Sequence, residues 1–179
     1  RRTLRAPALR QVPEGGAGRL KILHTADWHI GEFSGPVING ENARFLDTCK
    51  CLDALSDKAI EERPDIVLVS GDIFHAARTW SERGLHEVDT AIQYIRKLER
   101  VSPVVVMRGT PNHDGENHFE MLKTAFQNDP DVQVITRPCV IQVRGVNIAC
   151  LPGFDRGVFR AKFPGLSKED ECRVFTEEI

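Results

Sequence analysis

The segment DIVLVSGD, residues 65–72, decides the fold. It follows Pro64 and places four consecutive apolar residues before Ser70, Gly71 and Asp72. A continuous apolar run of this length is typical of a strand that is covered on both faces, as in a parallel sheet with helices packed against it. Pro64 ends any helix that comes before it. The segment therefore predicts a buried strand whose carboxyl end carries Asp72.

The segments on either side alternate between strand and helix patterns. Strands are predicted at LKILHTA (20–26) and PVVVM (103–107), and helices at residues 41–63 and 81–100. The expected inner face of the first helix consists of Phe45, Leu46, Leu52, Leu55 and Ile60. The order strand, helix, strand, helix, strand predicts an α/β fold with parallel neighbouring strands and helices on the faces of the sheet.

The second half of the chain has shorter elements. A helix is predicted at residues 118–126, followed by strands at 132–136, 139–143 and 146–152. We expect these three strands to be antiparallel and to form a second sheet. The last segment, from Ser167 to the end, has the pattern of a helix with Ser167 as its N-cap.

The composition predicts one soluble, cytoplasmic domain. Of the 179 residues, 41% are hydrophobic and 28% are charged, and the formal net charge is -2. No apolar run approaches the roughly 20 residues that cross a membrane. The five cysteines, at 49, 51, 139, 150 and 172, are an odd set with no CxxC pair and indicate neither a disulfide framework nor a zinc ribbon, so a reducing compartment is expected. We interpret residues 1–19, with five arginines, as a flexible lead-in, and residues 20–179 as the domain.

Polar residues follow each of the first three predicted strands. Asp27 and His29 follow the first, Asp72 the second, and Asn112 with its neighbours the third. In an extended segment, residues i and i+2 point to the same side, so Asp27 and His29 could bind one cation. Ligands gather beyond the carboxyl ends of parallel strands, and we expect the three loops to meet there. Taken singly, Asp72 could instead cap the next helix, and PNHDG (111–115) could be a simple Asx turn.

Three strings carry a resemblance to a known family. KILHTADWHIG (21–31), VLVSGDIFH (67–75) and GTPNHD (109–114) resemble the DxH, GD and NHD motifs of calcineurin-like metallophosphoesterases. The first string is most similar to the DNA-repair exonuclease branch, the SbcD type nuclease that works with an SbcC type ATPase. The resemblance covers about residues 20–155 and implies a sandwich of two mixed β-sheets flanked by helices.

The resemblance also implies roles for six residues. Asp27 and His29 would hold one metal ion, Asp72 would bridge two, and Asn112 would hold the second. His113 would act as proton donor or transition-state stabiliser. Asp114 would support His113 as the acceptor that fixes its tautomer. The mixed oxygen and nitrogen donors favour two Mn²⁺ ions.

The family pattern is not complete in this chain. It ends with a further histidine and a GHxH motif, whereas no histidine follows His118. We therefore expect an amino-terminal portion, incomplete at its C-terminus, that alone has little phosphodiesterase activity. Of the other histidines, we assign His24 to structural packing, and His75 is a candidate for contact with substrate or with the ligands. His86 and His118 are expected to face solvent on helices, and none of the four is predicted as a ligand.

Three functions remain open from the sequence. The leading one is Mn²⁺-dependent hydrolysis of DNA, as exonuclease and endonuclease in repair and recombination, with an SbcC type ATPase subunit as partner. The second is a phosphodiesterase of the same fold that acts on small molecules. The third is a non-catalytic remnant that binds a partner or DNA. Family members also dimerise through helices of this half, which makes residues 41–55 and 86–95 candidates for a homodimer contact.

Overall fold

A four-stranded parallel sheet forms the centre of the molecule. The structure is a computed structural model that describes residues 19–77, 82–167, 169–171 and 173–174, so the predicted lead-in lies outside it except for Arg19. The strand order is β1-β4-β5-β6, and all three pairings are parallel. The strands are β1 (Ile22–Thr25), β4 (Ile66–Ser70), β5 (Val104–Met107) and β6 (Val132–Ile135). The predicted α/β class is confirmed.

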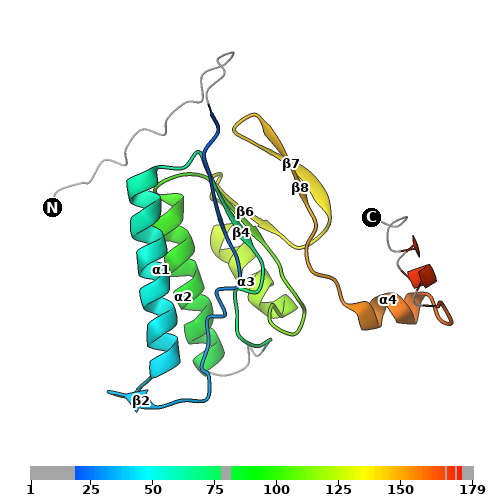
Figure 1. The fold of residues 1–179 in the computed structure, drawn as a ribbon, viewed down its shortest axis with the longest axis horizontal. Coiled ribbons are helices and arrows are strands. Elements are labelled where there is room, and N and C mark those ends of the chain that lie inside the picture. The colour runs from blue at the N-terminus through cyan, green and yellow to red at the C-terminus, as the bar shows by residue number, and fades with distance from the viewer. Residues whose placement is uncertain (1–18, 78–81, 168, 172, 175–179) are drawn as a thin grey trace.

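Three helices cover one face of this sheet. They are α1 (Ala43–Glu62), α2 (Glu82–Glu99) and α3 (Glu116–Phe126), and α1 and α2 lie side by side (Figure 1). Val67 and Val69 of β4 point to this side and belong to the same buried cluster as Leu52 of α1 and Leu98 of α2. This cluster is the main core. It holds the strands in place and so determines where the loops after the strands lie.

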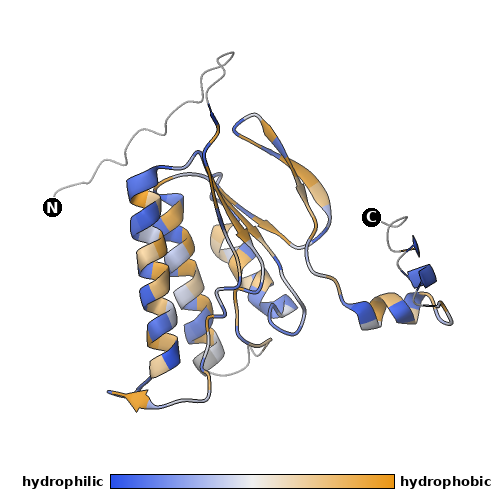
Figure 2. Cartoon of the chain, viewed as in Figure 1, coloured by the Kyte–Doolittle hydropathy of each residue, from blue (hydrophilic) through white to orange (hydrophobic). Residues whose placement is uncertain are grey.

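An antiparallel hairpin covers the other face. It consists of β7 (Cys139–Val143) and β8 (Val146–Cys150). Ile66 and Val105 alternate with the residues that face the helices, and they join Val143 and Cys150 in a second, smaller cluster. Figure 2 shows that apolar residues concentrate along the strands, whereas α1 and α2 carry polar residues on much of their surface. The two central strands, β4 and β5, are therefore apolar on both faces, as DIVLVSGD predicts for β4.

The predicted partner of the strand at 132–136 is wrong. We expected this strand in a second, antiparallel sheet, but β6 pairs with β5 in parallel, from Val104↔Val132 to Met107↔Ile135. The reason lies in the connection: α3 stands between β5 and β6 and provides the long crossover that a parallel pair needs. In the described residues, the sandwich thus has one parallel sheet and one two-stranded antiparallel hairpin rather than two mixed sheets.

The boundaries of α1 follow from local chemistry. The Asn42 side chain accepts hydrogen bonds from the backbone N–H groups of Arg44 (3.0 Å) and Phe45 (3.1 Å), which makes it the N-cap. The helix ends before Pro64, as predicted. The expected inner face is wrong at one position, because Ile60 is 57% exposed. Ala59, one position earlier, is buried in its place.

The remaining elements are short. β2 (Val37–Ile38) pairs with β3 (Glu41–Asn42), and α4 (Arg156–Lys162), which the sequence did not predict, begins after its N-cap Asp155. Residues 169–171 and 173–174 are helical, and the Ser167 hydroxyl accepts from the N–H of Asp170 at 3.1 Å. Within the described part of the chain, no helix has both the length and the apolar character needed to span a membrane.

Candidate metal centre

The loops after β1 and β4 stay hydrogen-bonded to each other beyond the ends of the strands. The N–H of Asp27 donates to the carbonyl of Gly71 at 3.0 Å, and the N–H of His29 donates to the carbonyl of Asp72 at 3.0 Å. The parallel pairing that positions β1 against β4 therefore continues into the segments DWH and GD. Residues that are 43 and 44 positions apart in sequence are thus fixed next to each other.

All three polar residues of these loops have left-handed backbone conformations. The φ angles are 54° for Asp27, 47° for His29 and 48° for Asp72. For residues other than glycine such angles cost of order 1–3 kcal/mol each, and they concentrate at functional sites. The segment is therefore not extended, and the i and i+2 argument for Asp27 and His29 does not apply. Their side chains still meet, with His29 Nε2 at 3.8 Å from Asp27 Oδ1.

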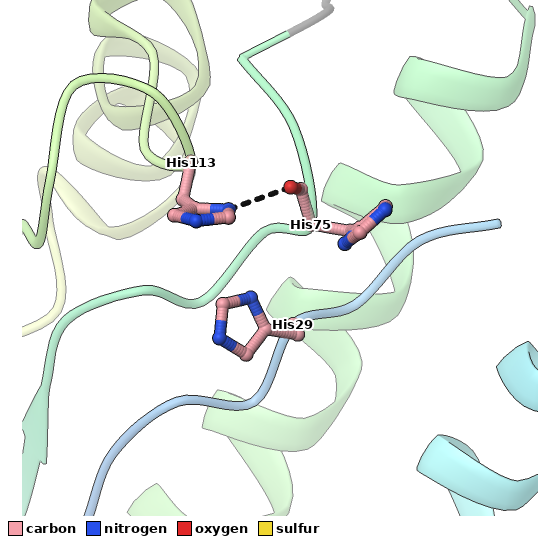
Figure 3. Close-up of side chains that lie close together, drawn as sticks. All are labelled: His29, His75 and His113. Carbon is pink, nitrogen blue, oxygen red and sulfur yellow. Dashed lines mark hydrogen bonds between the residues drawn. The ribbon is translucent and has the colours of Figure 1, made fainter. Parts of the chain in front are cut away.

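Two groups of potential metal ligands share His29. In the first, one ligand atom each from Asp27, His29 and Asp72 lies within 4.8 Å of the others. In the second, the same holds for His29, His75 and His113. Figure 3 shows the three imidazoles, which come from the loops after β1, β4 and β5. The structure therefore brings the three loops together at one edge of the sheet.

The donor set fits a divalent cation. His29 Nδ1 is buried and has no hydrogen-bond partner in the protein, which is rare for a buried polar atom. Asp27 and Asp72 place carboxylates beside this imidazole. A histidine nitrogen with two carboxylates is a combination that Mn²⁺ and other first-row divalent ions accept.

Asp72 is hydrogen-bonded to the loop after β5. Its Oδ1 accepts hydrogen bonds from the backbone N–H of Thr110 at 2.6 Å and from the Thr110 hydroxyl at 3.0 Å. The next helix begins only at Glu82, so Asp72 is not its N-cap. Thr110, which with Pro111 stands between Gly109 and the NHD motif, is thus a direct partner of Asp72.

Glycines allow the loops to approach this closely. Gly71 has φ +86°, and a Cβ there would lie 2.5 Å from the Cα of Gly109. A Cβ on Gly109 would lie 2.1 Å from the backbone nitrogen of Asp72. Because no side chain can occupy either position, the GD and GTPNHD loops pack backbone against backbone.

His113 is oriented by a backbone carbonyl. Its Nδ1 lies 2.6 Å from the carbonyl oxygen of His75, as the dashed line in Figure 3 shows. A carbonyl only accepts, so Nδ1 carries the proton and Nε2 is the nitrogen that can gain or lose one. The ring centroid lies 4.6 Å from that of His29 in an edge-to-face arrangement. His113 therefore has a ring of fixed orientation beside the first ligand group.

The role predicted for Asp114 is wrong. We expected its carboxylate to fix the tautomer of His113, but its hydrogen bonds go to the backbone of two loops. Its Oδ1 accepts from the N–H groups of Ile73 (2.9 Å) and Phe74 (3.1 Å). Its Oδ2 accepts from the N–H of Gly109 (2.7 Å). The physical reason is that these backbone donors need an acceptor inside the protein, where the Asp114 side chain is fully buried.

Burial has an electrostatic consequence at Asp114. Desolvation raises the pKa of this carboxyl group above its ordinary value, and the charge of Asp72 adds to the effect. The three backbone N–H groups act in the opposite direction. Asp114 is thus a structural tie between the loops after β4 and β5.

Asn112 lies in the same loop, between Thr110 and His113. Its side chain is exposed, and its backbone carbonyl accepts a hydrogen bond from the N–H of Ala77 at 3.1 Å. This hydrogen bond is a further link between the loop after β5 and the loop after β4. The role of Asn112 as a ligand of the second ion remains a prediction.

Two histidines differ from what the sequence suggested. His75, not predicted as a ligand, lies with His29 and His113, and its ring contacts that of Phe33 in a tilted arrangement with centroids 3.8 Å apart. His118, expected to face solvent, is fully buried and stacks on Phe74 at 4.2 Å. The helical spacing of His118 with the apolar positions 119, 122 and 126 could have revealed its burial.

The remaining two histidines lie outside these groups. His24 is exposed, and its Nε2 lies 2.8 Å from the Ser70 hydroxyl. His86 is exposed on α2, as predicted, with its ring centroid 5.0 Å from that of Phe45.

The hydrogen bonds that Asp114 accepts predict that the variant Asp114→Asn is less stable. An amide keeps one acceptor oxygen but turns an NH₂ group toward a buried N–H, which leaves at least one donor unpaired. We expect the free energy of unfolding to fall by about 2 kcal/mol, measured by urea denaturation. Asp57→Asn, at an exposed position of α1, should stay within about 0.5 kcal/mol of the unchanged protein. Equal stability of the two variants would contradict the assigned contacts.

Comparison with known proteins assigns the family. The family model of the calcineurin-like phosphoesterases matches residues 20–169. Among solved structures, the crystal structure of the Pseudomonas putida nuclease MPE matches 68% of this chain with 25% sequence identity and a TM-score of 0.38. The match covers 50% of that nuclease chain. Because the family model covers most of the sequence, the chain belongs to the calcineurin-like phosphoesterase family.

Proposed function

We propose that this protein is a metal-dependent phosphodiester hydrolase that acts on DNA, of the SbcD repair nuclease type. One observation carries the proposal: ligand atoms of Asp27, His29 and Asp72, from two separate loops, lie within 4.8 Å of one another. Family membership supports the phosphoesterase chemistry, since the family consists of dinuclear metal-dependent phosphoesterases.

Four residues would hold the ions. Asp27, His29 and Asp72 supply the clustered donors, and Asn112 follows in the third loop. When bound, two divalent ions polarise a phosphodiester and lower the pKa of a water that attacks the phosphorus. Mn²⁺ is the expected metal because the donors mix imidazole nitrogen with carboxylate oxygen.

The chain's own residues prepare the rest of the reaction. The hydrogen bond from His113 Nδ1 to the carbonyl of His75 places the proton of the neutral ring on Nδ1 and leaves Nε2 without one. In the imidazolium form, Nε2 can donate a proton to the oxygen that leaves the phosphorus. Thr110 holds the Asp72 carboxylate through two hydrogen bonds and so restricts its rotation. The buried Asp114 keeps the loop of His113 against the loop of Asp72.

The substrate and partners rest on the first motif. DWHIG, residues 27–31, supports a DNA substrate because it resembles the repair exonuclease branch. The same resemblance supports an SbcC type ATPase subunit as partner and a homodimer. The cysteines are an odd set of five without a CxxC pair and indicate neither a disulfide framework nor a zinc ribbon, which supports a cytoplasmic location.

Binding and hydrolysis should be measured on the same preparation. Calorimetry with Mn²⁺ should show saturable binding, and a duplex DNA should be hydrolysed faster than a small aryl phosphodiester. Faster hydrolysis of the small substrate would overturn the DNA assignment and favour a small-molecule phosphodiesterase.

The longest natural form of the chain is the decisive sample. Mn²⁺ binding without hydrolysis of either substrate in that form would point to the non-catalytic remnant. No binding of Mn²⁺ would overturn the metal centre itself.

A further inference from the structure

Two cysteines face each other in the hairpin on the second face of the sheet. The register of β7 and β8 pairs Cys139 directly with Cys150, at the open end of the hairpin. Arg144 and Gly145, with φ 52° and 77°, form its two-residue turn. This turn fixes the register, so the two cysteines remain opposite each other.

The strand register places the Cα atoms of the two cysteines within the range that a disulfide bond spans. Val143 and Val146 flank the turn as a hydrogen-bonded pair, and pair types alternate along an antiparallel ladder. Four steps away, Cys139 and Cys150 are again a hydrogen-bonded pair, for which Cα atoms are about 5.5 Å apart. Disulfides span Cα distances of about 4.4–6.8 Å. Burial raises the pKa of the Cys150 thiol, and the neighbouring Cys139 adds to this.

The two thiols differ in exposure. Cys139 is exposed, whereas Cys150 is 6% exposed and belongs to the smaller core cluster. A dissolved oxidant therefore reaches Cys139 first. Cys49 and Cys51 lie two positions apart on α1, where side chains do not face each other. Among the cysteines that the structure describes, only Cys139 and Cys150 are cross-strand partners.

The hairpin leads directly to the candidate metal centre. Three residues after Cys150, the N–H of Gly153 donates to the carbonyl of Arg108 at 2.9 Å. A Cβ on Gly153 would lie 2.1 Å from the carbonyl oxygen of Gly109, so the two backbones touch. The end of β8 thus abuts the loop that carries Thr110 and His113.

We propose that Cys139 and Cys150 form a reversible disulfide under peroxide, and that this bond restrains the loop of residues 108–114. The Cys139 thiol attacks one oxygen of hydrogen peroxide, giving a sulfenic acid and one water. The Cys150 sulfur then attacks the sulfenic sulfur, which forms the S–S bond and releases the second water. Two thiols are oxidised, and one peroxide is reduced to two waters. A dithiol reductant restores both thiols.

Peptide mapping and hydrogen exchange test both parts. After peroxide treatment, mass spectrometry should find one cross-linked species that joins the peptides of Cys139 and Cys150. The thermal midpoint should rise by about 5 °C, because a loop of 12 residues is closed. Amide exchange in residues 108–114 should slow, and dithiothreitol should reverse all three changes.

Matched variants separate the cause. Cys139→Ser, at an exposed position, should abolish the cross-link, the rise of the thermal midpoint and the slower exchange. Cys51→Ser, exposed on α1, should retain all three. Separate oxidation of the two thiols, or a Cys139 to Cys139 bond between molecules, would overturn the disulfide. A Cys139–Cys150 bond with unchanged exchange in residues 108–114 would overturn the restraint of the loop.

Discussion

Replacing Asp72 with asparagine is expected to lower the affinity for Mn²⁺ more than about 100-fold, since the loss of residues that only support ligands already costs about 10–100-fold. The carboxylate lies with Asp27 and His29 in the cluster of potential ligands, and its charge is removed. The amide oxygen can still accept from the N–H and hydroxyl of Thr110, so the loop contact survives. Isothermal titration with MnCl₂ measures the effect.

The control for this variant is chosen for charge and exposure. Asp57→Asn removes one negative charge from an exposed position of α1, and its Mn²⁺ affinity should equal that of the unchanged protein. Equal thermal midpoints for Asp72→Asn and the unchanged protein would show that the fold is intact. An affinity of Asp72→Asn within about threefold of the control would remove Asp72 from the metal centre.

The sequence predicts the sheet well because the signal is local. The run from Ile66 to Val69 has no polar position, and this alone indicates a strand with two covered faces. The alternation with helix patterns then predicts parallel neighbours, and the structure shows β1, β4 and β5 in that arrangement. The expectation for β6 was wrong because it set this alternation aside, although the helix predicted at residues 118–126 already separates this strand from β5. The length of the crossover through α3 was the better guide.

The contacts of the site could be predicted only in part. The topology of the sheet predicts that the polar residues after three of its strands gather beyond the carboxyl ends of the strands. The hydrogen bonds from the N–H groups of Ile73 and Phe74 to Asp114 do not follow from topology. These donors lie about 40 positions earlier, and no periodic pattern marks them. The left-handed φ angles of Asp27 and His29 were equally hidden. They arise from the pairing of the two loops, a tertiary effect that a single segment cannot indicate.

The loops form one connected unit rather than three separate contributors. Asp72 binds Thr110, and the Ala77 N–H binds the carbonyl of Asn112. The His75 carbonyl orients His113. Each bond joins the loop after β4 to the loop after β5. A ligand on one loop is therefore positioned by the others, which is the preorganisation that metal-assisted hydrolysis requires.

The variant His113→Gln is expected to leave the Mn²⁺ affinity within about threefold of the unchanged protein and to slow phosphodiester hydrolysis about 1000-fold. Glutamine can still donate a hydrogen bond toward the carbonyl of His75, but it has no nitrogen that titrates near neutral pH. The rates should be measured on the longest natural form of the chain.

His86→Gln, at an exposed position of α2, is the matched control and should change neither affinity nor rate. The geometry also allows His113 itself to be a ligand, because its ligand atom lies within 4.8 Å of those of His29 and His75. If His113→Gln lowers the Mn²⁺ affinity as strongly as Asp72→Asn does, then His113 binds the metal ion. In that case the proton must come from another group. Loss of rate with unchanged affinity would instead assign the titrating Nε2 of His113 to the leaving oxygen.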